Sequence, residues 1–466
     1  MLSRGDLQFV INLIMMKVKN MANLGKDKAE KFLIQGGRIL SGEIEVRGAK
    51  NAATPILAAS LLTQEECFID NLPLIEDVFR MIEVLKSLGA EIRWIGPRCL
   101  KIRAKNVNPS KMNFDLVSRL RSSVLLMGAL IGRRGLPAQA GVSFKIAKPG
   151  GCQLGTRILD PHLDGFSRLG VRIKKDDGFY EIDAKGLKGG EIVMSEFSVT
   201  ATENLVLAAV SAPGRTVIKC AAAEPYVQDL CHFLKKMGAK IEGIGTHTLV
   251  IEGKKLRGAS HMIIPDPIEM GTFISLAGAS KSELTVKNVV PQFIELELLK
   301  FKEAGLNFKI LNKRVLPAGW GYQIGDLKVS GPFKIKAVKK VHNMPYPGFA
   351  ADSIPTFALL MTQAKGVSLI HDWMYEARLK YVDELQRLGA NAFVCDPHRA
   401  LITGPTALEG KEITSFDLRT GATLILAGLI AKGETIINNA YQVDRGYERI
   451  EERLQKIGAN IKRVSL

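Results

Sequence analysis

The chain has 466 residues, of which 46% are hydrophobic and 24% charged, so it is long enough for two or more folded domains and has a globular composition. The formal net charge of +17 favours anionic ligands. Because the basic residues are spread along the chain without a dense run or recognition motif, nucleic-acid binding would depend on net charge alone.

The first 30 residues are predicted to be an N-terminal extension. Its apolar stretch, residues 9–16, is too short to span a bilayer and is followed by no secretory cleavage site. Either an additional amphipathic helix or a later start at Met15, Met16 or Met21 explains it. The six cysteines form no CxxC pair, which indicates reduced thiols and a cytoplasmic location.

A helical pattern that ends in glycine and leads directly into a strand occurs six times along the chain. The glycines are Gly89, Gly170, Gly238, Gly305, Gly389 and Gly458, with spacings of 81, 68, 67, 84 and 69 residues. Each is placed where a helix C-terminus needs a left-handed backbone. A second Ala/Leu-rich helix followed by a β-branched run recurs in phase. The pattern predicts six copies of a unit with two helices and several strands, grouped into two lobes.

The segment Gly48-Ala49-Lys50-Asn51 lies between a predicted strand and an Ala-rich helix. An ammonium group beside free backbone N–H groups at a helix start favours an anion. An ordinary lysine at a helix start is the alternative.

Cys152 lies in a predicted loop, Lys148-Pro-Gly-Gly-Cys152, followed by Arg157. Pro-Gly-Gly is typical of loops and not of core strands. Lys145, Lys148 and Arg157 would stabilise a thiolate, so we predict a reactive thiol here. The other five cysteines occur in apolar or strand-like surroundings and are expected to be inert.

The last third of the chain concentrates acidic and basic side chains at predicted strand–helix junctions. Any one acid–arginine set is more often a surface salt bridge or a helix cap, but four at equivalent junctions indicate an anion-binding cleft. The sets contain Asp352, Glu376 with Arg378, Asp417 with Arg419, and the segment from Asp444 and Arg445 to Arg449.

The Lys50, Cys152, Asp417-Leu-Arg419 and Asp444-Arg-Gly-Tyr-Glu-Arg449 segments resemble the UDP-N-acetylglucosamine 1-carboxyvinyltransferase family of enolpyruvyl transferases, over residues 32–464. The resemblance implies an α/β fold, a two-lobed inside-out α/β barrel of six repeated βαβαββ units, three per lobe, with the substrates bound between the lobes. One lobe would comprise residues 49–258 and the other residues 1–48 plus 259–466.

The implied reaction transfers the enolpyruvyl group of phosphoenolpyruvate to the 3-hydroxyl of UDP-N-acetylglucosamine and releases phosphate, the first committed step of peptidoglycan synthesis. By resemblance, Cys152 protonates carbon 3 of phosphoenolpyruvate and is alkylated by fosfomycin, and Asp352 receives the hydroxyl proton. The phosphate clamp would be Lys50, Arg157 and Arg445, with Asn51 beside it and Arg419 a further candidate. The implied contacts to the acceptor are Arg121, Arg157, Ile158, Leu159, Asp160, Pro161, Ser198, Val199 and Met374. The family requires neither a cofactor nor a metal.

Several positions depart from the family pattern. Glu196 replaces a lysine near the nucleotide phosphates, a charge that Lys145 or Lys148 could restore; Ala350-Ala351 replaces Pro-Thr, Ala377 replaces an asparagine, and the segment before Cys152 is longer. Two alternatives stay open at this point. A 5-enolpyruvylshikimate-3-phosphate synthase-like transferase needs no catalytic thiol, and a non-catalytic nucleotide-sugar-binding paralogue would not need Cys152, Asp352, Lys50 and Arg445 together.

Overall fold

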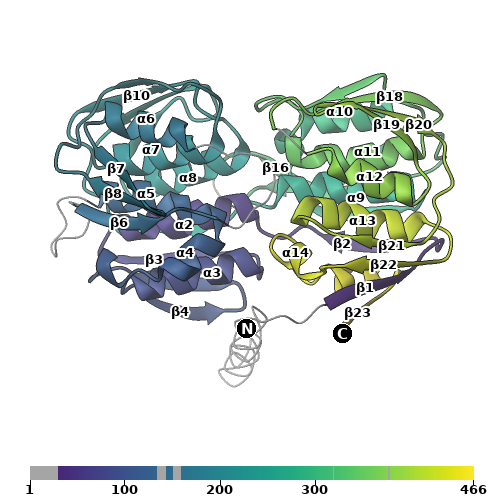
Figure 1. Ribbon diagram of the computed structural model, residues 1–466, viewed down its shortest axis with the longest axis horizontal. Helices are drawn as coiled ribbons and strands as arrows, with labels where there is room; N and C mark the ends of the chain where they lie inside the picture. The colour runs from purple at the N-terminus through teal and green to yellow at the C-terminus, as the bar shows by residue number, and fades with distance from the viewer. Residues whose placement is uncertain (1–29, 134–142, 151–158, 318–319, 376–377, 466) are drawn as a thin grey trace. The chain divides into compact units, whose positions relative to one another are not determined.

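The computed structural model describes residues 30–133, 143–150, 159–317, 320–375 and 378–465. They divide into two compact units, shown in Figure 1. The described part of unit 1 lies within residues 48–264, and that of unit 2 comprises residues 30–47 and 265–465. The chain passes between units after Arg47 and after Ile264.

Unit 1 contains three sheets and two sets of helices. The strand orders are β13-β3-β5-β4 (Ser260–Met262, Glu66–Asp70, Cys99–Arg103, Glu91–Gly96), β6-β8-β7 (Ser143–Ala147, Phe179–Asp183, Arg172–Asp176) and β11-β12-β10-β9 (Lys240–Glu242, Thr248–Glu252, Arg215–Lys219, Glu191–Val193). The helices are α2 (Lys50–Ala59), α3 (Glu76–Ser87), α4 (Phe114–Arg119), α5 (Leu125–Gly132), α6 (Asp160–Arg168), α7 (Val199–Ala209) and α8 (Pro225–Lys236), with 3-10 turns η1 (Ser60–Leu62), η2 (Pro109–Lys111) and η3 (Arg121–Val124).

Unit 2 repeats this plan. Its strand orders are β15-β16-β14-β2 (Asn307–Val315, Gln323–Ser330, Leu284–Val289, Gly42–Glu45), β17-β18-β20-β19 (Lys340–His342, Gly366–His371, Arg399–Gly404, Asn391–Asp396) and β21-β22-β1-β23 (Glu412–Thr414, Glu434–Asn438, Glu30–Gln35, Asn460–Ser465). The helices are α9 (Pro267–Ala279), α10 (Glu295–Glu303), α11 (Ile354–Thr362), α12 (Lys380–Arg387), α13 (Leu418–Ile430), α14 (Tyr441–Asp444) and α15 (Ile450–Gln455), with 3-10 turns η4 (Pro291–Phe293) and η5 (Ala351–Ser353).

In each four-stranded sheet, one edge strand runs parallel to its inner neighbour, and the other two strand pairs are antiparallel. In β17-β18-β20-β19, for example, β17 runs parallel to β18 with His342 opposite His371, and the remaining pairs are antiparallel. Among the described residues, the β6-β8-β7 sheet has no such parallel edge strand, because the corresponding segment of chain forms α4. The N-terminal strand β1 completes the last sheet between β22 and β23, so chain segments far apart in sequence form one repeat.

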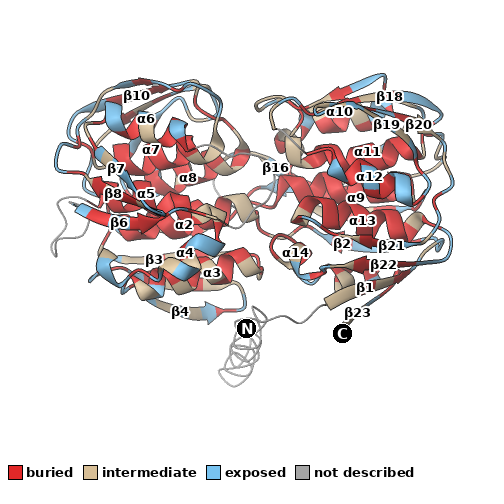
Figure 2. Cartoon of the chain, in the orientation of Figure 1, coloured by how far each residue is buried: buried red, intermediate tan, exposed pale blue. Residues whose placement is uncertain are grey.

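The second helical element of each repeat lies in the core of its unit. In α9 every residue from Pro267 to Ala279 is buried, and α5 is buried throughout, as Figure 2 shows for the central helices. A helix that is apolar on all sides needs protein on all sides. The central helices pack pairwise, α5 against α7 in unit 1 and α11 against both α9 and α13 in unit 2. Nowhere in the described residues is a helix sufficiently long and apolar to cross a membrane.

The predicted left-handed glycines are confirmed. Gly89, Gly170, Gly238, Gly305, Gly389 and Gly458 have φ angles of 100°, 79°, 107°, 90°, 98° and 96°. An L-residue adopts this conformation only at a cost, whereas glycine ends the helix without one. The repeated outer helices therefore stop where the sequence predicted.

A second glycine role is close packing between central helices. A Cβ at Gly128 of α5 would lie 2.3 Å from the backbone oxygen of Asn204 in α7. The Asn204 side chain bridges the same contact: its Oδ1 accepts from the Gly128 N–H (2.8 Å) and its Nδ2 donates to the Val124 carbonyl (3.0 Å). This contact fixes the two helices relative to each other inside unit 1.

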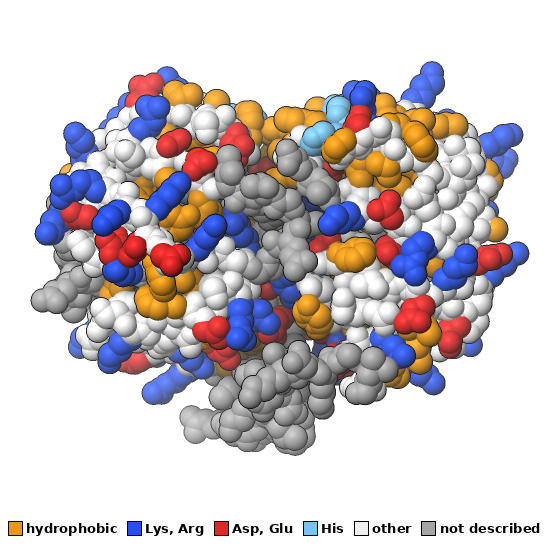
Figure 3. Space-filling view, viewed as in Figure 1, with side chains coloured by type: hydrophobic (Ala, Val, Ile, Leu, Met, Phe, Trp, Pro, Cys, Tyr) orange, Lys and Arg blue, Asp and Glu red, His pale blue; other side chains and the backbone are white. Residues whose placement is uncertain are grey.

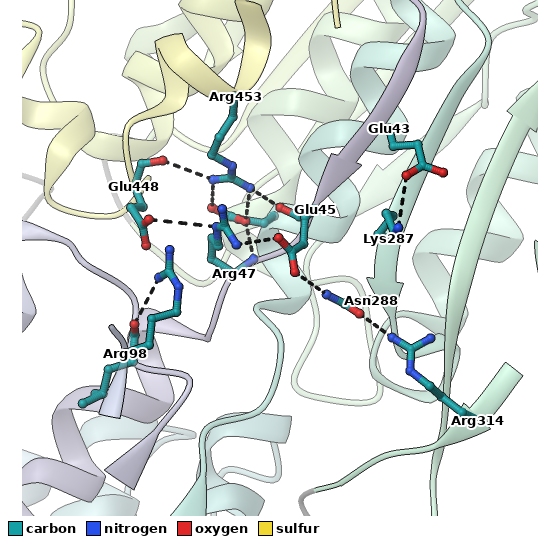
Figure 4. A network of polar contacts seen from close by, with 11 residues as sticks. Glu43, Glu45, Arg47, Arg98, Lys287, Asn288, Arg314, Glu448 and Arg453 are labelled. Atoms are coloured by element: carbon teal, nitrogen blue, oxygen red, sulfur yellow. Dashed lines mark hydrogen bonds and ion pairs between the residues drawn. The ribbon is translucent and has the colours of Figure 1, made fainter. Parts of the chain in front are cut away.

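In unit 2 a buried ion pair holds the segment that leads out of β2 (Figure 4). The Arg453 guanidinium donates to both carboxylate oxygens of Glu269 at 2.7 Å and to the Glu45 carbonyl at 2.6 Å. Glu269 also accepts from the Arg47 backbone N–H (2.9 Å). Bidentate pairing of this kind is strong and directional, so it fixes residues 45–47 against the start of α9.

Candidate active site

Seven of the predicted site positions lie at the N-terminal ends of central helices or in the turns beside them. Lys50 and Asn51 begin α2, Arg121 begins the turn before α5, and Ser198 and Val199 begin α7; Asp352 lies in the turn before α11, and Arg419 in the first turn of α13. Cys152, Arg157 and Ile158 lie outside the described residues. Helix N-termini carry unpaired N–H groups and the positive end of the helix dipole, so these positions are suited to binding anionic ligands.

In unit 1, Lys50 is held by a buried acid. Its Nζ lies 2.7 Å from Oδ2 of Asp77, whose side chain is 3% exposed, while Lys50 itself is 13% exposed. The ammonium group therefore has a fixed position at the start of α2. Neighbouring Asn51 is half-buried.

His162 directly follows the predicted positions Leu159, Asp160 and Pro161, and sequence reasoning missed it. Its Nε2 lies 3.2 Å from Oγ1 of Thr200, next to Val199, and its Nδ1 accepts from Nδ2 of Asn204 at 2.8 Å. Burial, with the nearby charge of Arg121, lowers the pKa of His162 to about 3. A neutral imidazole in the first turn of α6 thus bonds to Thr200 and Asn204 of α7.

In unit 2, Asp352 lies between two buried arginines. Its Oδ1 accepts from Arg378 at 2.7 Å and its Oδ2 from Arg419 Nε at 3.0 Å. Both guanidiniums are 4% exposed, whereas the carboxylate is 28% exposed. Burial opposes both positive charges, but Asp352 and neighbouring acids raise the pKa of each arginine above its ordinary value. The carboxylate is therefore the accessible part of a rigid, charged cluster.

Arg419 and Asp417 play separate roles although they are two residues apart. Asp417 caps α13, accepting from the backbone N–H groups of Arg419 (2.8 Å) and Thr420 (3.1 Å), so the cap alternative is correct for this residue. The Arg419 guanidinium lies over the ring of Tyr447 at 5.5 Å, and the Tyr447 hydroxyl is 2.9 Å from Oγ1 of Thr272.

Arg378 belongs to the cluster although the resemblance assigned it no role. Its Nε lies 3.8 Å from Oδ2 of Asp372, a buried acid that accepts from Nδ2 of Asn343 at 2.5 Å. Burial raises the pKa of Asp372 to about 6, against the opposing effect of Arg378. The only sequence signal for this contact was an acid and an arginine near the end of a predicted strand.

Arg445 and Met374 lie in unit 2 as well. Arg445 follows α14, is 7% exposed and donates to Oε1 of Gln442 at 3.3 Å. The neighbouring acid Asp444 pairs with Arg463, at 2.6 Å and 2.7 Å, and not with Arg445. Met374 is half-buried, two residues after Asp372.

Of the five cysteines expected to be inert, Cys67 and Cys231 are buried, Cys99 and Cys220 are half-buried, and Cys395 is exposed. Burial raises the pKa of Cys67 to about 11 and that of Cys231 to about 12, so neither is a thiolate at neutral pH. In the part of the chain that the structure describes, no group of three or more His, Cys, Asp or Glu side chains is arranged to hold a metal.

The surface charge is mixed. On the face shown in Figure 3, Lys and Arg side chains alternate with Asp and Glu side chains. Glu196 is exposed, and Lys145 is already paired with Glu181 (2.5 Å) and Asp176 (3.5 Å). Lys145 is therefore a poor candidate to restore the charge that Glu196 reverses.

Comparison with solved structures defines the class of protein. The enolpyruvyl transferase NikO of Streptomyces tendae superposes with a TM-score of 0.81 at 25% identity, covering 94% of this chain and 100% of that one. EPSP synthase of Acinetobacter baumannii has the same fold, with a TM-score of 0.72 at 18% identity over 93% of this chain and 100% of its own. The fold, predicted as an inside-out α/β barrel, is thus that of enolpyruvyl transferases.

Sequence comparison narrows the class. The model of the EPSP synthase (3-phosphoshikimate 1-carboxyvinyltransferase) family matches residues 34–454. UDP-N-acetylglucosamine 1-carboxyvinyltransferase of Treponema denticola is 39% identical over 92% of this chain and 98% of its own, and that of Halothermothrix orenii is 41% identical over 93% and 99%. The chain belongs to this enolpyruvyl transferase family and, within it, to the UDP-N-acetylglucosamine 1-carboxyvinyltransferases.

Proposed function

We propose that this enzyme transfers the enolpyruvyl group of phosphoenolpyruvate to the 3-hydroxyl of UDP-N-acetylglucosamine and releases phosphate, the first committed step of peptidoglycan synthesis. The observation that carries the proposal is Asp352, an accessible carboxylate held between the buried guanidiniums of Arg378 and Arg419. Family membership supports the same reaction, since the relatives that match over nearly the whole chain have this activity in their names.

The reaction is an addition followed by an elimination. In the addition, the sugar hydroxyl oxygen bonds to carbon 2 of phosphoenolpyruvate and loses its proton to Asp352, while carbon 3 gains a proton from Cys152. In the elimination, carbon 3 gives a proton back to the Cys152 thiolate, the double bond to carbon 2 forms again, and the bond from carbon 2 to the phosphate oxygen breaks, so that phosphate leaves. General acid–base catalysis of the addition therefore requires a base beside the hydroxyl oxygen and an acid beside carbon 3.

The two arginines explain how Asp352 can become a base when substrate arrives. A carboxylate that accepts from two guanidiniums is stabilised in its charged form and is a weak base. An anionic substrate competes for the same donors, because guanidiniums bind phosphate and carboxylate groups bidentately. In the proposed reaction, an anionic substrate that accepts from Arg378 and Arg419 takes donors away from Asp352 and leaves its oxygens free to accept the hydroxyl proton.

The remaining predicted residues would bind the two substrates. Lys50, Arg157 and Arg445, with Asn51, would neutralise the phosphate of phosphoenolpyruvate. The acceptor would be bound by Arg121, residues 157–161, Ser198, Val199 and Met374, the positions that the resemblance implies. We also propose a cytoplasmic location, since the cysteines of the described residues are all free thiols.

Phosphate release from phosphoenolpyruvate, measured with and without UDP-N-acetylglucosamine, tests the proposal. Turnover should require the sugar nucleotide, and Cys152→Ala should lower it by about 10²- to 10⁴-fold because the general acid is lost. Cys152→Asp should keep activity and resist fosfomycin, since a carboxyl group can donate the proton but has no thiol to alkylate. Sugar-independent turnover, or full activity in Cys152→Ala, would contradict the assignment.

A further inference from the structure

The backbone conformation at the carboxyl end of the inner strand differs in one of the parallel strand pairs. In four of the five parallel pairs, a residue with a left-handed backbone marks the carboxyl end of the inner strand: Asn71, Cys220, Asn288 and Asn439, with φ angles of 56°, 56°, 62° and 60°. At the end of β18 the corresponding residue is Asp372, which is not among the left-handed residues. The next residue is Trp373, whose side chain is 47% exposed.

Trp373 is fixed although much of its ring is exposed. Its indole Nε1–H donates to the Asn343 carbonyl at 2.6 Å, and its backbone N–H donates to Oδ1 of Asn343 at 3.1 Å. Asn343 is fully buried and directly follows β17, the parallel neighbour of β18. Because the polar atom of the indole is already bonded inside the protein, the exposed part of the ring is apolar carbon in a single orientation.

The side chains of Asn343, Asp372 and Arg378 form a series of polar contacts between Trp373 and Asp352. Asn343 donates to Oδ1 of Asp372 at 2.5 Å, and Oδ2 of Asp372 lies 3.8 Å from Nε of Arg378. Arg378 in turn donates to Asp352 at 2.7 Å. The exposed ring and the proposed base are therefore positioned by one network of buried polar groups, at the carboxyl ends of two parallel strands, where ligands of α/β proteins commonly bind.

We propose that Trp373 is a specificity-determining residue for the acceptor, and that its exposed indole packs against the C–H face of the acceptor's sugar ring. This inference rests on the proposed function, in which Asp352 takes a proton from a hydroxyl of that sugar. A rigid aromatic ring loses little conformational entropy on binding, and binding sites combine such apolar surface with a few polar groups that fix orientation. In this proposal, Asn343 fixes the orientation of the ring, and Asp352 accepts the proton of the sugar hydroxyl.

Steady-state kinetics of Trp373→Ala and Trp373→Phe test the role. Loss of the ring should raise KM for UDP-N-acetylglucosamine about three- to tenfold, the range expected for one aromatic contact, with a smaller rise for Phe. KM for phosphoenolpyruvate should change less than about twofold on the same basis. Phe393→Ala is the matched control, because Phe393 is an aromatic residue of the same sheet with 65% exposure, and it should leave both constants unchanged.

Intrinsic fluorescence gives a readout that does not depend on turnover. The chain has three tryptophans, Trp94, Trp320 and Trp373. UDP-N-acetylglucosamine should change the emission of the unaltered enzyme and of Trp94→Phe, but this change should be lost in Trp373→Phe. UDP, which lacks the sugar, should bind the unaltered enzyme and Trp373→Ala with equal affinity.

Three results would overturn the proposal. They are an unchanged KM for UDP-N-acetylglucosamine in Trp373→Ala, an equal loss of affinity for UDP, and an unchanged fluorescence response in Trp373→Phe. Dissociation of an oligomer in Trp373→Ala with unchanged kinetics would instead assign the ring to contact with a second copy. If Trp373→Ala fails to fold, the Phe variant and the fluorescence titration decide. Absence of any turnover in the unaltered enzyme would contradict the proposed function, whereas the UDP comparison would still test the sugar contact.

Discussion

The two units have the same plan but different side chains at the N-terminal ends of their central helices. In unit 1 these ends carry Lys50, Arg121 and Ser198, whereas in unit 2 they carry Asp266, Asp352 and Asp417. A helix N-terminus stabilises negative charge. Unit 2 supplies that charge from its own side chains, and unit 1 places cations and a hydroxyl there, which suits the phosphates of a ligand.

The difference shows how one repeated fold can carry different chemistry at equivalent helix ends. In unit 2 the acids hold buried arginines in place before any ligand binds, at the cost of burying several charges together. In unit 1 the contact between α5, α6 and α7 is made by neutral groups, because Asn204 bonds to His162 and to the Gly128 N–H. Loss of charge in the Asp352 cluster should therefore be more damaging than a steric substitution at a close contact between helices.

The largest expected effect comes from Asp352→Asn in unit 2. Turnover should fall about 10²- to 10⁴-fold, because an amide cannot accept the hydroxyl proton. The free energy of unfolding should fall by about 3 kcal/mol, the low end for a broken buried pair, since Asp352 is partly exposed while Arg378 and Arg419 are buried. Phosphate release and urea unfolding measure the two effects.

Asp396→Asn is the matched control for charge. Asp396 also pairs with an arginine, Arg399 at 2.6 Å, but in an exposed turn. Its replacement should leave turnover unchanged. Equal losses in both variants would show that the Asp352 cluster has no special role.

The next effect compares a close helix contact, at Gly128 in unit 1, with an open helix position, at Gly271 in unit 2. Gly128→Ala places a Cβ 2.3 Å from the Asn204 backbone oxygen and should destabilise the protein by about 3 kcal/mol, because α5 and α7 must separate. Gly271→Ala, in α9, meets nothing closer than Ser353 Oγ at 3.4 Å and should be neutral or stabilise by up to about 1 kcal/mol. Urea unfolding of both variants measures this; similar free energies would contradict the difference in packing.

Sequence reasoning predicted the features that are local in the chain. The six capping glycines and the apolar central helices depend on neighbours a few residues away, so their pattern is legible without a structure. The partners within the site depend on tertiary contact instead. Arg419 is two residues from Asp417 but donates to Asp352, 67 residues away. His162 had no sequence signal, because its role comes from Thr200 and Asn204 on another helix.

The smallest expected effect is on the pH dependence of stability, to which His162 in unit 1 and Asp372 in unit 2 should contribute with opposite sign. The folded state lowers the pKa of His162 from 6.5 to about 3, so the unfolded chain binds a proton first and stability is lost as pH falls from about 6.5. The folded state raises the pKa of Asp372 from 3.8 to about 6, so the folded chain binds a proton first and stability is gained as pH falls from about 6 to 4. Each group contributes at most about 1.4 kcal/mol per pH unit.

Urea unfolding at pH 7.0, 5.5 and 4.5 separates the two contributions. Relative to the unaltered enzyme, His162→Gln should gain stability as the pH falls, because the titrating imidazole is gone. Asp372→Asn should lose stability over the same interval, because the relief that protonation gives is gone. The groups share no partner, as His162 contacts Thr200 and Asn204 while Asp372 contacts Asn343 and Arg378. The double variant should therefore show the sum of the two changes. Slopes of the same sign would mean that His162 and Asp372 do not respond to protons as their buried surroundings require.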